Sequence, residues 1–520
     1  MTAELQLLSP LLAVAFTALL VMVVSWFTDD RDARVPGGIA VAGLAVAGVL
    51  GMRLWRALGP GDALPAFSRP APALGEGARV ALLCFDALGV YALLALILVA
   101  VVVSLSAIGY LQRNDLFRSE FYFVMLVATA SMMLLAVSDD LIMIFLAIEA
   151  FSIALYVLCA LRRSERLSQE AALKYFVLGA FSAGFQLYGV ALLYAETGVT
   201  ALPALAASLT QPTPLVWAGV AMLVVGLAFK VALVPFHQWT PDVYDGAPTI
   251  VTAFMAAGTK LAAFVALVRV MWTALPGLSE TLLPLLTVLA VATMVVGNLA
   301  ALVQGNLKRM LAYSAVAHAG YLLVGVAAGP VEGTPAVLFY LLIYGLTNLG
   351  AFAVLMALGP LGEEGRDATR LEDLAGLARR HPWLAALLSL FLLSLTGLPP
   401  TAGFLAKWYI FRAAIDAGLL PLAIILVLNS VVSAFYYVRP IAWMTMREAA
   451  PDAPAIEVDG PNAVALTLAG AVVALALLVG RPLIEGAQRA AGQDGVATAE
   501  RGEMAPGVFF TAPQLDKDGR

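Results

Sequence analysis

Four ionisable side chains lie deep inside long apolar stretches of this sequence. They are Glu149 in LIMIFLAIEAFSIALYVL, Lys230 in VVGLAFKVALVPFHQW, Lys260 in FMAAGTKLAAFVALV and Lys407 in GLPPTAGFLAKWYIF. An ionisable group at the centre of a bilayer costs about 3 kcal/mol on insertion scales, so the four together cost on the order of 10 kcal/mol. A buried ion pair, or a lysine whose head reaches the interface, would explain them structurally. The cost instead favours a role in moving ions or protons.

The chemistry open to such a set is proton transfer. A lysine that is removed from water releases its proton more readily, whereas a nearby carboxylate favours the protonated form. Separating Glu149 from Lys230, or changing the water around either residue, would therefore move a proton on or off the lysine. The sequence contains no ATP-binding loop, dinucleotide fingerprint, metal cluster or catalytic triad beside these residues, so the energy must come from elsewhere.

A polar stripe on a later apolar stretch adds a fifth candidate. His318 in LAYSAVAHAGYLLVG has Ser314 four residues before it and Tyr321 three residues after it, so the three side chains share one helical face. A lone histidine in a membrane helix is more often a hydrogen-bonded packing residue than a proton carrier. The stripe makes a role in proton transfer as reasonable as that structural one.

The elements that must position these residues are membrane helices. Of the 520 residues, 62% are apolar or aromatic and 12% are charged, with a mean hydropathy of +0.91. A soluble domain carries roughly 25% charged residues, so a soluble globule is excluded. Fourteen apolar runs are long enough to cross a bilayer, the first near 7–27 without the basic start of a cleavable signal peptide. We predict an all-α polytopic membrane protein with about 14 transmembrane helices.

Proline and glycine interrupt the seventh and twelfth of these predicted helices. The interrupting residues are Pro235 and Pro241 after Lys230, and Gly397, Pro399, Pro400 and Gly403 before Lys407. Broken helices in corresponding places favour two inverted repeats. We predict helices 1–3 in 1–115, one five-helix repeat in 116–275, a second in 276–447, each with a broken helix, and a last helix with a flexible polar tail in 448–520.

Basic residues indicate the orientation. On one side of the predicted topology lie Arg113, Arg118, Arg162, Arg163, Arg166, Lys308, Arg309, Arg366, Arg370, Arg379 and Arg380, and the opposite loops near 138–140, 197–213 and 329–335 carry no Lys or Arg. Because cytoplasmic loops carry the excess of basic residues, both termini are expected outside the cytoplasm. The loop at 52–80, with four arginines, runs against this rule.

The net charge and the numbers of cysteines and histidines argue against several classes of protein. The net charge of -5 is spread between the helices and indicates no nucleic-acid partner. Cys84 and Cys159 lie singly in apolar runs, so neither a disulfide framework nor a cysteine-bound metal or iron–sulfur cluster is expected. Three histidines without a paired-ligand motif argue against a haem.

The quoted motifs resemble a known family. The stretch FKVALVPFHQWTPDVYDGAPTIVTAFMAAGTKLAAF, together with LKRMLAYSAVAHAGY and SLTGLPPTAGFLAKWYIF, resembles the antiporter-like subunits of respiratory complex I. The resemblance covers nearly the whole chain and implies fourteen helices with two inverted five-helix repeats. It also implies proton translocation through a mid-membrane hydrophilic axis with two half-channels.

The resemblance assigns a role to each candidate. Glu149 matches the family's glutamate on the fifth helix, Lys230 the lysine at the break of the seventh, and Lys260 the lysine on the eighth. Lys407 matches the residue on the twelfth helix that ends the row of charges. The Glu–Lys pair is implied to tune the proton affinity of the lysine. His318 lies on the tenth helix between Lys260 and Lys407, a position that suits a bridging group.

The resemblance further implies a subunit of the enzyme NADH:quinone oxidoreductase, a proton-pumping translocase, in a bacterial cytoplasmic (inner) membrane. This chain would hold no cofactor or metal, and NADH, FMN, iron–sulfur clusters and quinone would be bound by other subunits. Its partners would be the antiporter-like subunit M, small membrane subunits, the lipid bilayer, protons and water.

Within the family, a lysine at 407 distinguishes this chain from the M type, which has glutamate there. The L type extends into a long lateral helix and a further membrane span. We expect the residues after 481 to be too few to form them. Two readings outside this assignment stay open: an Mrp-type Na⁺/H⁺ antiporter subunit and the equivalent subunit of a membrane-bound hydrogenase-like complex. A self-contained solute carrier is disfavoured, because the sequence shows no unwound segment with a cluster of side chains to hold an organic substrate. A purely structural scaffold is disfavoured by the buried charges.

Overall fold

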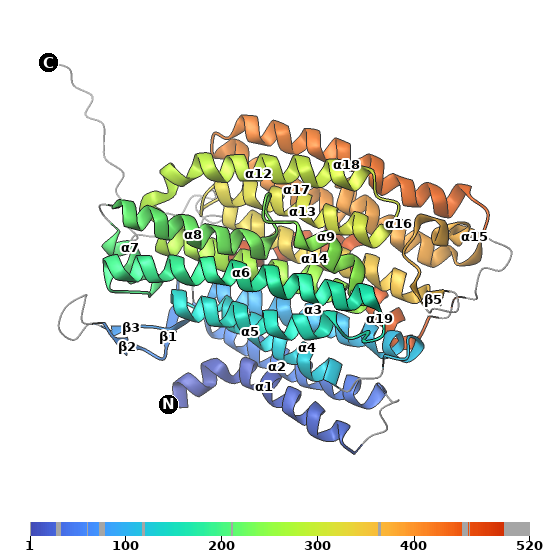
Figure 1. Ribbon diagram of the computed structural model, residues 1–520, viewed down its shortest axis with the longest axis horizontal. Coiled ribbons are helices and arrows are strands. Elements are labelled where there is room, and N and C mark those ends of the chain that lie inside the picture. Colours follow the sequence, from blue (N-terminus) through green and yellow to red (C-terminus); the bar gives the residue numbers. More distant parts are fainter. Residues whose placement is uncertain are drawn as a thin grey trace.

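The computed structural model describes residues 2–27, 33–59, 61–71, 79–116, 120–209, 212–361, 366–449, 456 and 458–492. Within these ranges the chain is mostly helical, and the long helices lie side by side along one direction (Figure 1). The strands are short and lie near the ends of the helices. The predicted all-α polytopic membrane architecture is confirmed in this coarse form.

Eleven helices among the described residues are long and apolar enough to cross a membrane. They are α1 (Thr2–Ser25), α2 (Arg34–Ala57), α3 (Ala87–Arg113), α5 (Leu141–Cys159), α6 (Arg166–Thr197), α8 (Pro214–Val231), the helical stretch Thr249–Ala274, α12 (Ser279–Leu302), α13 (Leu307–Ala327), α14 (Gly333–Ala357) and α18 (Leu420–Met446). The predicted fourth, twelfth and last crossings correspond to shorter apolar helices, namely α4 (Glu120–Ala136), α16 (Pro382–Thr396) and α19 (Gly460–Ala474).

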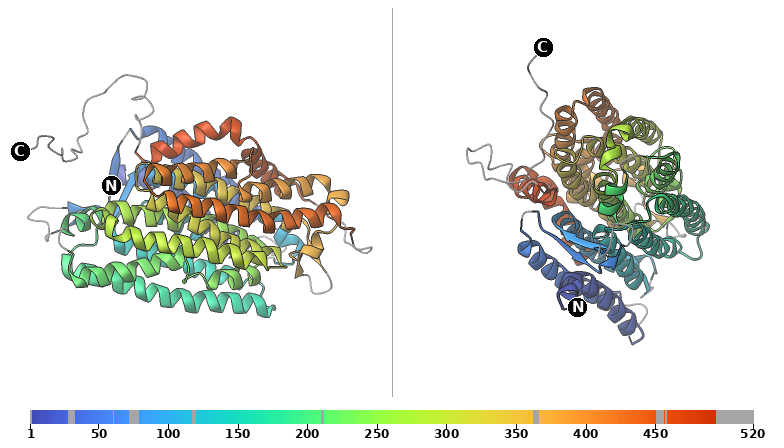
Figure 2. Two further views of the ribbon diagram at one scale, coloured as in Figure 1. Left: turned by 90° about the horizontal axis from the view of Figure 1, so that it is seen from above. Right: turned by 90° about the vertical axis from the view of Figure 1, so that its left-hand side faces the viewer.

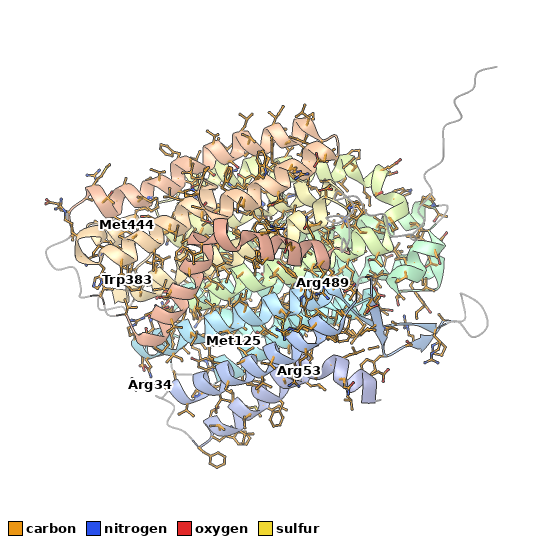
Figure 3. All side chains as sticks on the ribbon, turned by 180° about the vertical axis from the view of Figure 1, so that it is seen from behind. Arg34, Arg53, Met125, Trp383, Met444 and Arg489 are labelled. Carbon is orange, nitrogen blue, oxygen red and sulfur yellow. The ribbon has the colours of Figure 1, made fainter. Side chains whose placement is uncertain are left out.

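The bundle has a buried centre and a rim suited to lipid. In the most apolar 18 residues of Thr249–Ala274 and of α14, all residues are buried. In the most apolar 18 residues of α1, 33% of the residues are buried. Viewed along the helices, α1 and α2 lie at one edge (Figure 2). Large apolar side chains such as Phe181 and Phe435 are exposed on the outer helices, and side chains project outward all round the bundle (Figure 3). In a membrane, an apolar rim of this kind contacts lipid.

The central stretch Thr249–Ala274 is not a uniform α-helix. Two α-helical segments, α10 (Thr249–Phe254) and α11 (Lys260–Arg269), are each followed by a π-helical turn, η2 (Met255–Thr259) and η3 (Val270–Ala274). Such wider turns occur mostly as single insertions, often at functional sites. Here η2 ends immediately before Lys260 and so sets the direction in which that side chain leaves the helix.

Both interruptions that the sequence indicated are present. The first separates α8 from α9 (Trp239–Gly246), and the second separates α16 from α17 (Ala402–Asp416). Each contains a cis peptide bond, Val234–Pro235 and Pro399–Pro400. At the second, Gly397 has φ +85°, a left-handed conformation that glycine adopts without steric cost and that ends the helix. The last turn of each first half-helix is therefore left with carbonyl groups that need partners.

The loop at 52–80 contains short strands, and one of its arginines forms an ion pair. Strand β1 (Ala63–Ala66) pairs antiparallel with β4 (Leu83–Asp86), and β2 (Arg69–Pro70) with β3 (Arg79–Val80). Arg69 Nη2 lies 2.8 Å from Asp140 Oδ2. This arginine therefore forms an ion pair within the protein. A third pair, β5 (Pro360–Leu361) with β6 (Arg366–Asp367), lies between α14 and α16.

The end of the chain is more helical than the sequence indicated. After α19, α20 (Ala476–Ala490) continues into the region expected to be a tail, and Arg489 of α20 (labelled in Figure 3) donates to the carbonyls of Trp55 at 3.1 Å and Leu58 at 2.6 Å. The predicted tail beyond residue 492, like Arg118, lies outside the described residues.

Candidate functional site

The first part of the site is the pair formed by Lys230 and Glu149. Lys230 is the penultimate residue of α8, and its Nζ donates to Ser152 Oγ of α5 at 2.8 Å. Glu149 Oε1 lies 3.8 Å from the same Nζ, too far for a direct hydrogen bond. Lys230 is 5% exposed and Glu149 lies one turn from Ser152 on α5. The two charges thus attract each other across a gap while a hydroxyl holds the ammonium.

Lys260 is held by the end of the first interrupted helix. Its Nζ donates to the carbonyl oxygen of Val231, the last residue of α8, at 3.1 Å. Lys260 is 2% exposed. A positive charge at a helix C-terminus is favoured by the helix dipole and satisfies a carbonyl that has lost its partner in the helix. Lys260 therefore binds the residue that follows Lys230 at the C-terminal end of α8.

Lys407 makes the corresponding contact at the second interruption. Its Nζ donates to the carbonyl oxygen of Thr396, the last residue of α16, at 2.8 Å. The same Nζ lies 4.7 Å from the centre of the Tyr321 ring, over its face. Gly397 leaves room for this side chain, since a Cβ there would lie 2.7 Å from Lys407 Cδ.

His318 lies at the centre of a group of tyrosines. Its Nδ1 is 2.8 Å from Tyr340 Oη and its Nε2 is 3.1 Å from Tyr437 Oη. Tyr437 Oη also bonds Ser314 Oγ. The ring of Tyr321 lies 5.4 Å from the imidazole, so Tyr321 separates His318 from Lys407.

The five predicted residues therefore fall into two groups. Glu149, Lys230 and Lys260 gather around the end of α8, whereas His318 and Lys407 are joined through Tyr321. Among the described residues, no hydrogen bond links Lys260 directly to His318. The geometry gives two polar clusters in the buried centre of the bundle rather than one continuous row of direct contacts.

Several polar residues around the second cluster were missed by reasoning from the sequence. Asn298 Nδ2 lies 3.0 Å from Tyr321 Oη and 3.1 Å from Asn429 Oδ1, and Tyr436 Oη donates to Asn298 Oδ1 at 2.9 Å. These residues come from α12, α13 and α18. The sequence offers only isolated polar residues in apolar runs as a signal, because each partner lies on another helix.

A buried hub of charges at one end of the bundle was also missed. The Asp367 carboxylate accepts from Arg162 Nη2 at 2.6 Å, from Tyr110 Oη at 2.9 Å and from the Thr249 backbone N–H at 3.3 Å. Lys308 Nζ lies 4.0 Å away. Burial alone would favour the neutral acid, but the positive charges of Lys308 and Arg162 outweigh it and lower the pKa of Asp367. The sequence had suggested Arg162 and Lys308 only as indicators of orientation.

The opposite end of the bundle carries a second group of charges. Arg269, the last residue of α11, donates to both carboxylate oxygens of Asp86, at 2.9 and 2.7 Å. Asp139 lies in the loop before α5. Burial, aided by the negative charges of Asp86 and Asp140 and opposed by Arg269, raises the pKa of Asp139 to about 6.

Among the residues that the structure describes, no group of three or more His, Cys, Asp or Glu side chains is arranged to hold a metal ion. Cys84 and Cys159 are free thiols. The arrangement is suited to handling protons, since its groups are lysines, a carboxylate, an imidazole and hydroxyls.

Comparison with known proteins identifies the family. The model of the family described as NADH:quinone oxidoreductase/Mrp antiporter, TM, matches residues 138–433. The protein named NADH-quinone oxidoreductase subunit N 1 of Herpetosiphon aurantiacus is 45% identical over 466 residues, which cover 88% of this chain and 90% of the relative. A chain of respiratory complex I from Thermus thermophilus with bound aureothin is 35% identical, with a TM-score of 0.75, over 91% of this chain and 98% of that chain.

A chain of the Mrp complex from Dietzia sp. DQ12-45-1b has a TM-score of 0.81 at 23% identity over 96% of this chain and 99% of that one, which shows a shared fold. The family model covers more than half of the chain, and relatives well above 30% identity match most of their own length. The chain therefore belongs to the NADH:quinone oxidoreductase/Mrp antiporter transmembrane family.

Proposed function

We propose that this chain is the antiporter-like subunit N of an NADH:quinone oxidoreductase and translocates protons while other subunits carry electrons from NADH to quinone. The similarity to proteins named subunit N, at high coverage of both chains, supports this assignment. The Mrp-type alternative rests on a likeness of fold at lower identity. The enzyme is thus the whole complex, of which this chain would be one transport unit.

The observation that carries the proposal is the buried contact of Lys230 with Ser152 and Glu149 at the end of α8. With Glu149 close, the ammonium form of Lys230 is favoured by a negative charge and by the hydroxyl oxygen. When the two move apart, the desolvated ammonium loses that support and gives up its proton. A small displacement at the helix break would thus become a proton transfer.

The proton would then travel sideways through the bundle. We assign the order Glu149, Lys230, Lys260, His318 and Lys407, with His318 as the bridging group. The first two steps are supported because Glu149 lies beside Lys230 and Lys260 binds the carbonyl of Val231, the residue after Lys230. The last step is supported because Tyr321 lies between His318 and Lys407. Water is proposed for the step between Lys260 and His318, because no hydrogen bond joins these two residues in the described structure and buried polar groups are commonly bridged by water.

The architecture that would support this transport is fourteen crossings with two inverted repeats. Counting the three shorter apolar helices with the eleven long ones gives that number. We place helices 1–3 in 1–115, the repeats in 116–275 and 276–447, and the last helix with its tail in 448–520. The two interruptions, each with a lysine on the last carbonyl before the break, support a repeat relationship.

The membrane location, the orientation and the partners of the chain are proposed from the same assignment. We propose a bacterial cytoplasmic membrane, with both termini on the non-cytoplasmic side and the Asp367 hub at the cytoplasmic end. The partners would be subunit M and the small membrane subunits of the complex. NADH, FMN, iron–sulfur clusters and quinone would be held by those other subunits, and this chain would hold none.

The test is a tagged purification of this chain from its native membranes in mild detergent. We expect a very large assembly that oxidises NADH and reduces quinone in an inhibitor-sensitive manner, with the complex I subunits identified by mass spectrometry. Elution with a few membrane chains and no NADH oxidation would contradict the assignment and point to an Mrp-type antiporter.

A further inference from the structure

The hydrogen bonds of His318 extend in a row that the lateral axis does not need. Ser314 Oγ bonds Tyr437 Oη, which lies 3.1 Å from His318 Nε2, and His318 Nδ1 lies 2.8 Å from Tyr340 Oη. All four side chains are at most 2% exposed. They come from three helices, α13, α14 and α18, so the row is a product of packing. It is unbroken from Ser314 to Tyr340.

The row runs along the helices rather than across them. α13 and α14 are consecutive helices joined by a short turn, so they run in opposite directions. Ser314 lies seven residues after the start of α13, and Tyr340 lies seven residues after the start of α14. The two helices start at opposite ends of the bundle, and each residue lies about 10 Å along its own helix from that start. The row thus crosses the middle of the membrane.

Each member of the row can both donate and accept a hydrogen bond. A hydroxyl carries one donor and two acceptor sites, and a neutral imidazole carries one N–H and one acceptor nitrogen. If Ser314 donates to Tyr437 and Tyr437 donates to Nε2, the imidazole must carry its proton on Nδ1 and donate to Tyr340. All hydrogen bonds of the row can therefore be donated in one direction along it. They can be donated in the opposite direction after each donor and its acceptor have exchanged roles.

We propose that Ser314, Tyr437, His318 and Tyr340 form a transverse relay that carries protons across the middle of the membrane and crosses the lateral axis at His318. This inference rests on the proposed function, since the relay shares His318 with the lateral axis. It assigns roles to Ser314, Tyr437 and Tyr340, which the lateral axis leaves unused.

The transfer leaves no member changed in charge. A proton from water binds Ser314 Oγ, whose own proton passes to Tyr437 Oη, and the phenol proton passes to His318 Nε2. The Nδ1 proton passes to Tyr340 Oη, whose own proton leaves to water. Each oxygen gains one O–H bond and loses one, and His318 changes tautomer. Rotation of the hydroxyls and return of the tautomer reset the relay, so no net charge has to rest in the apolar centre.

Phenylalanine substitutions test the relay, because each removes one oxygen and keeps the ring. The variants are Tyr437→Phe and Tyr340→Phe, and the matched control is Tyr344→Phe. Tyr344 lies one turn after Tyr340 on α14 with its ring 4.9 Å from His318, but its hydroxyl bonds none of the four relay groups in the described structure. The measurement is protons pumped per NADH oxidised by the whole complex in vesicles.

We expect this ratio to fall at least fivefold in Tyr437→Phe and Tyr340→Phe and to stay within twofold of the parent in Tyr344→Phe. If Tyr437→Phe does not assemble, Ser314→Ala tests the same row and should show the same loss. Normal pumping by all the relay variants, with loss in Lys230→Met, would overturn the relay and leave the lateral axis standing. Normal pumping by Lys230→Met as well would instead contradict the proposed function.

Discussion

Lys260 and Lys407 make the same contact with two different interrupted helices. Lys260 Nζ binds the carbonyl of Val231 at 3.1 Å, and Lys407 Nζ binds that of Thr396 at 2.8 Å. In each case the carbonyl belongs to the last residue before a break and has no partner further along its own helix. A proton carrier placed there senses any movement of the break, because the helix end supplies its hydrogen bond.

Removing either member of the first pair should uncouple proton transfer from electron transfer. We expect Lys230→Met and Glu149→Gln to lower proton pumping in vesicles at least tenfold, which corresponds to about 1.4 kcal/mol. Electron transfer from NADH to artificial acceptors should be unchanged, because this chain is proposed to hold no redox group. Lys174→Ala is the control, since Lys174 is 40% exposed and pairs with Glu170 and Asp242 on the surface. Proton pumping at the parent level in both variants would exclude the proposed path of proton transfer.

The glycine before the second break should matter for two separable reasons. Gly397→Ala places a side chain at φ +85°, which costs roughly 1–2 kcal/mol of stability. It also brings a Cβ to 2.7 Å from Lys407 Cδ and so should displace the lysine from the Thr396 carbonyl. Gly418→Ala is the control, because Gly418 has φ +75° and open space around its Cβ position.

Both glycine variants should therefore lose similar thermal stability in detergent, while only Gly397→Ala loses pumping. Equal pumping in the two would show that the position of Lys407 against the helix end is unimportant.

The Asp367 hub should be a major contribution to stability. Asp367→Asn removes the charge that faces the buried cations Arg162 and Lys308, and leaves Arg162 its ion pair with Glu165. Breaking a buried ion pair from one side costs about 3–5 kcal/mol. We expect lower yield of assembled complex and a lower melting temperature. Asp416→Asn, which disturbs only an exposed pair with Arg412, should leave both near the parent values.

Asp139 should make stability depend on pH in the direction opposite to most carboxylates. Its pKa is raised to about 6 from 3.8, so the folded chain binds the proton more tightly than the unfolded chain. The stabilisation from the protonated form is present below pH 4 and is lost as the pH rises through 6. Asp139→Asn should therefore raise the melting temperature at pH 7.5, through a gain in stability of up to about 3 kcal/mol, and leave it unchanged near pH 4. A gain of the same size at both pH values would contradict this titration.

The sequence by itself determined the class of protein, most of the helices and the places where two of them break. These features are local, because hydropathy and the backbone limits of proline and glycine act within one segment. The same local reasoning singled out Glu149, Lys230, Lys260, His318 and Lys407 by the cost of burying them, and their roles stay a prediction. It gave no account of the basic loop at 52–80, in which Arg69 forms an ion pair with Asp140.

Only the tertiary structure decided which groups meet. Lys230 bonds a serine 78 residues earlier, and His318 bonds a tyrosine 119 residues later. Tyr437, Tyr340 and Asp367 carried no signal in the sequence, because a hydroxyl or a loop carboxylate acquires its role from the side chain that packing brings to it. Hydrogen bonds act over about 3 Å, and the helices that supply both partners are adjacent only after the whole bundle has formed.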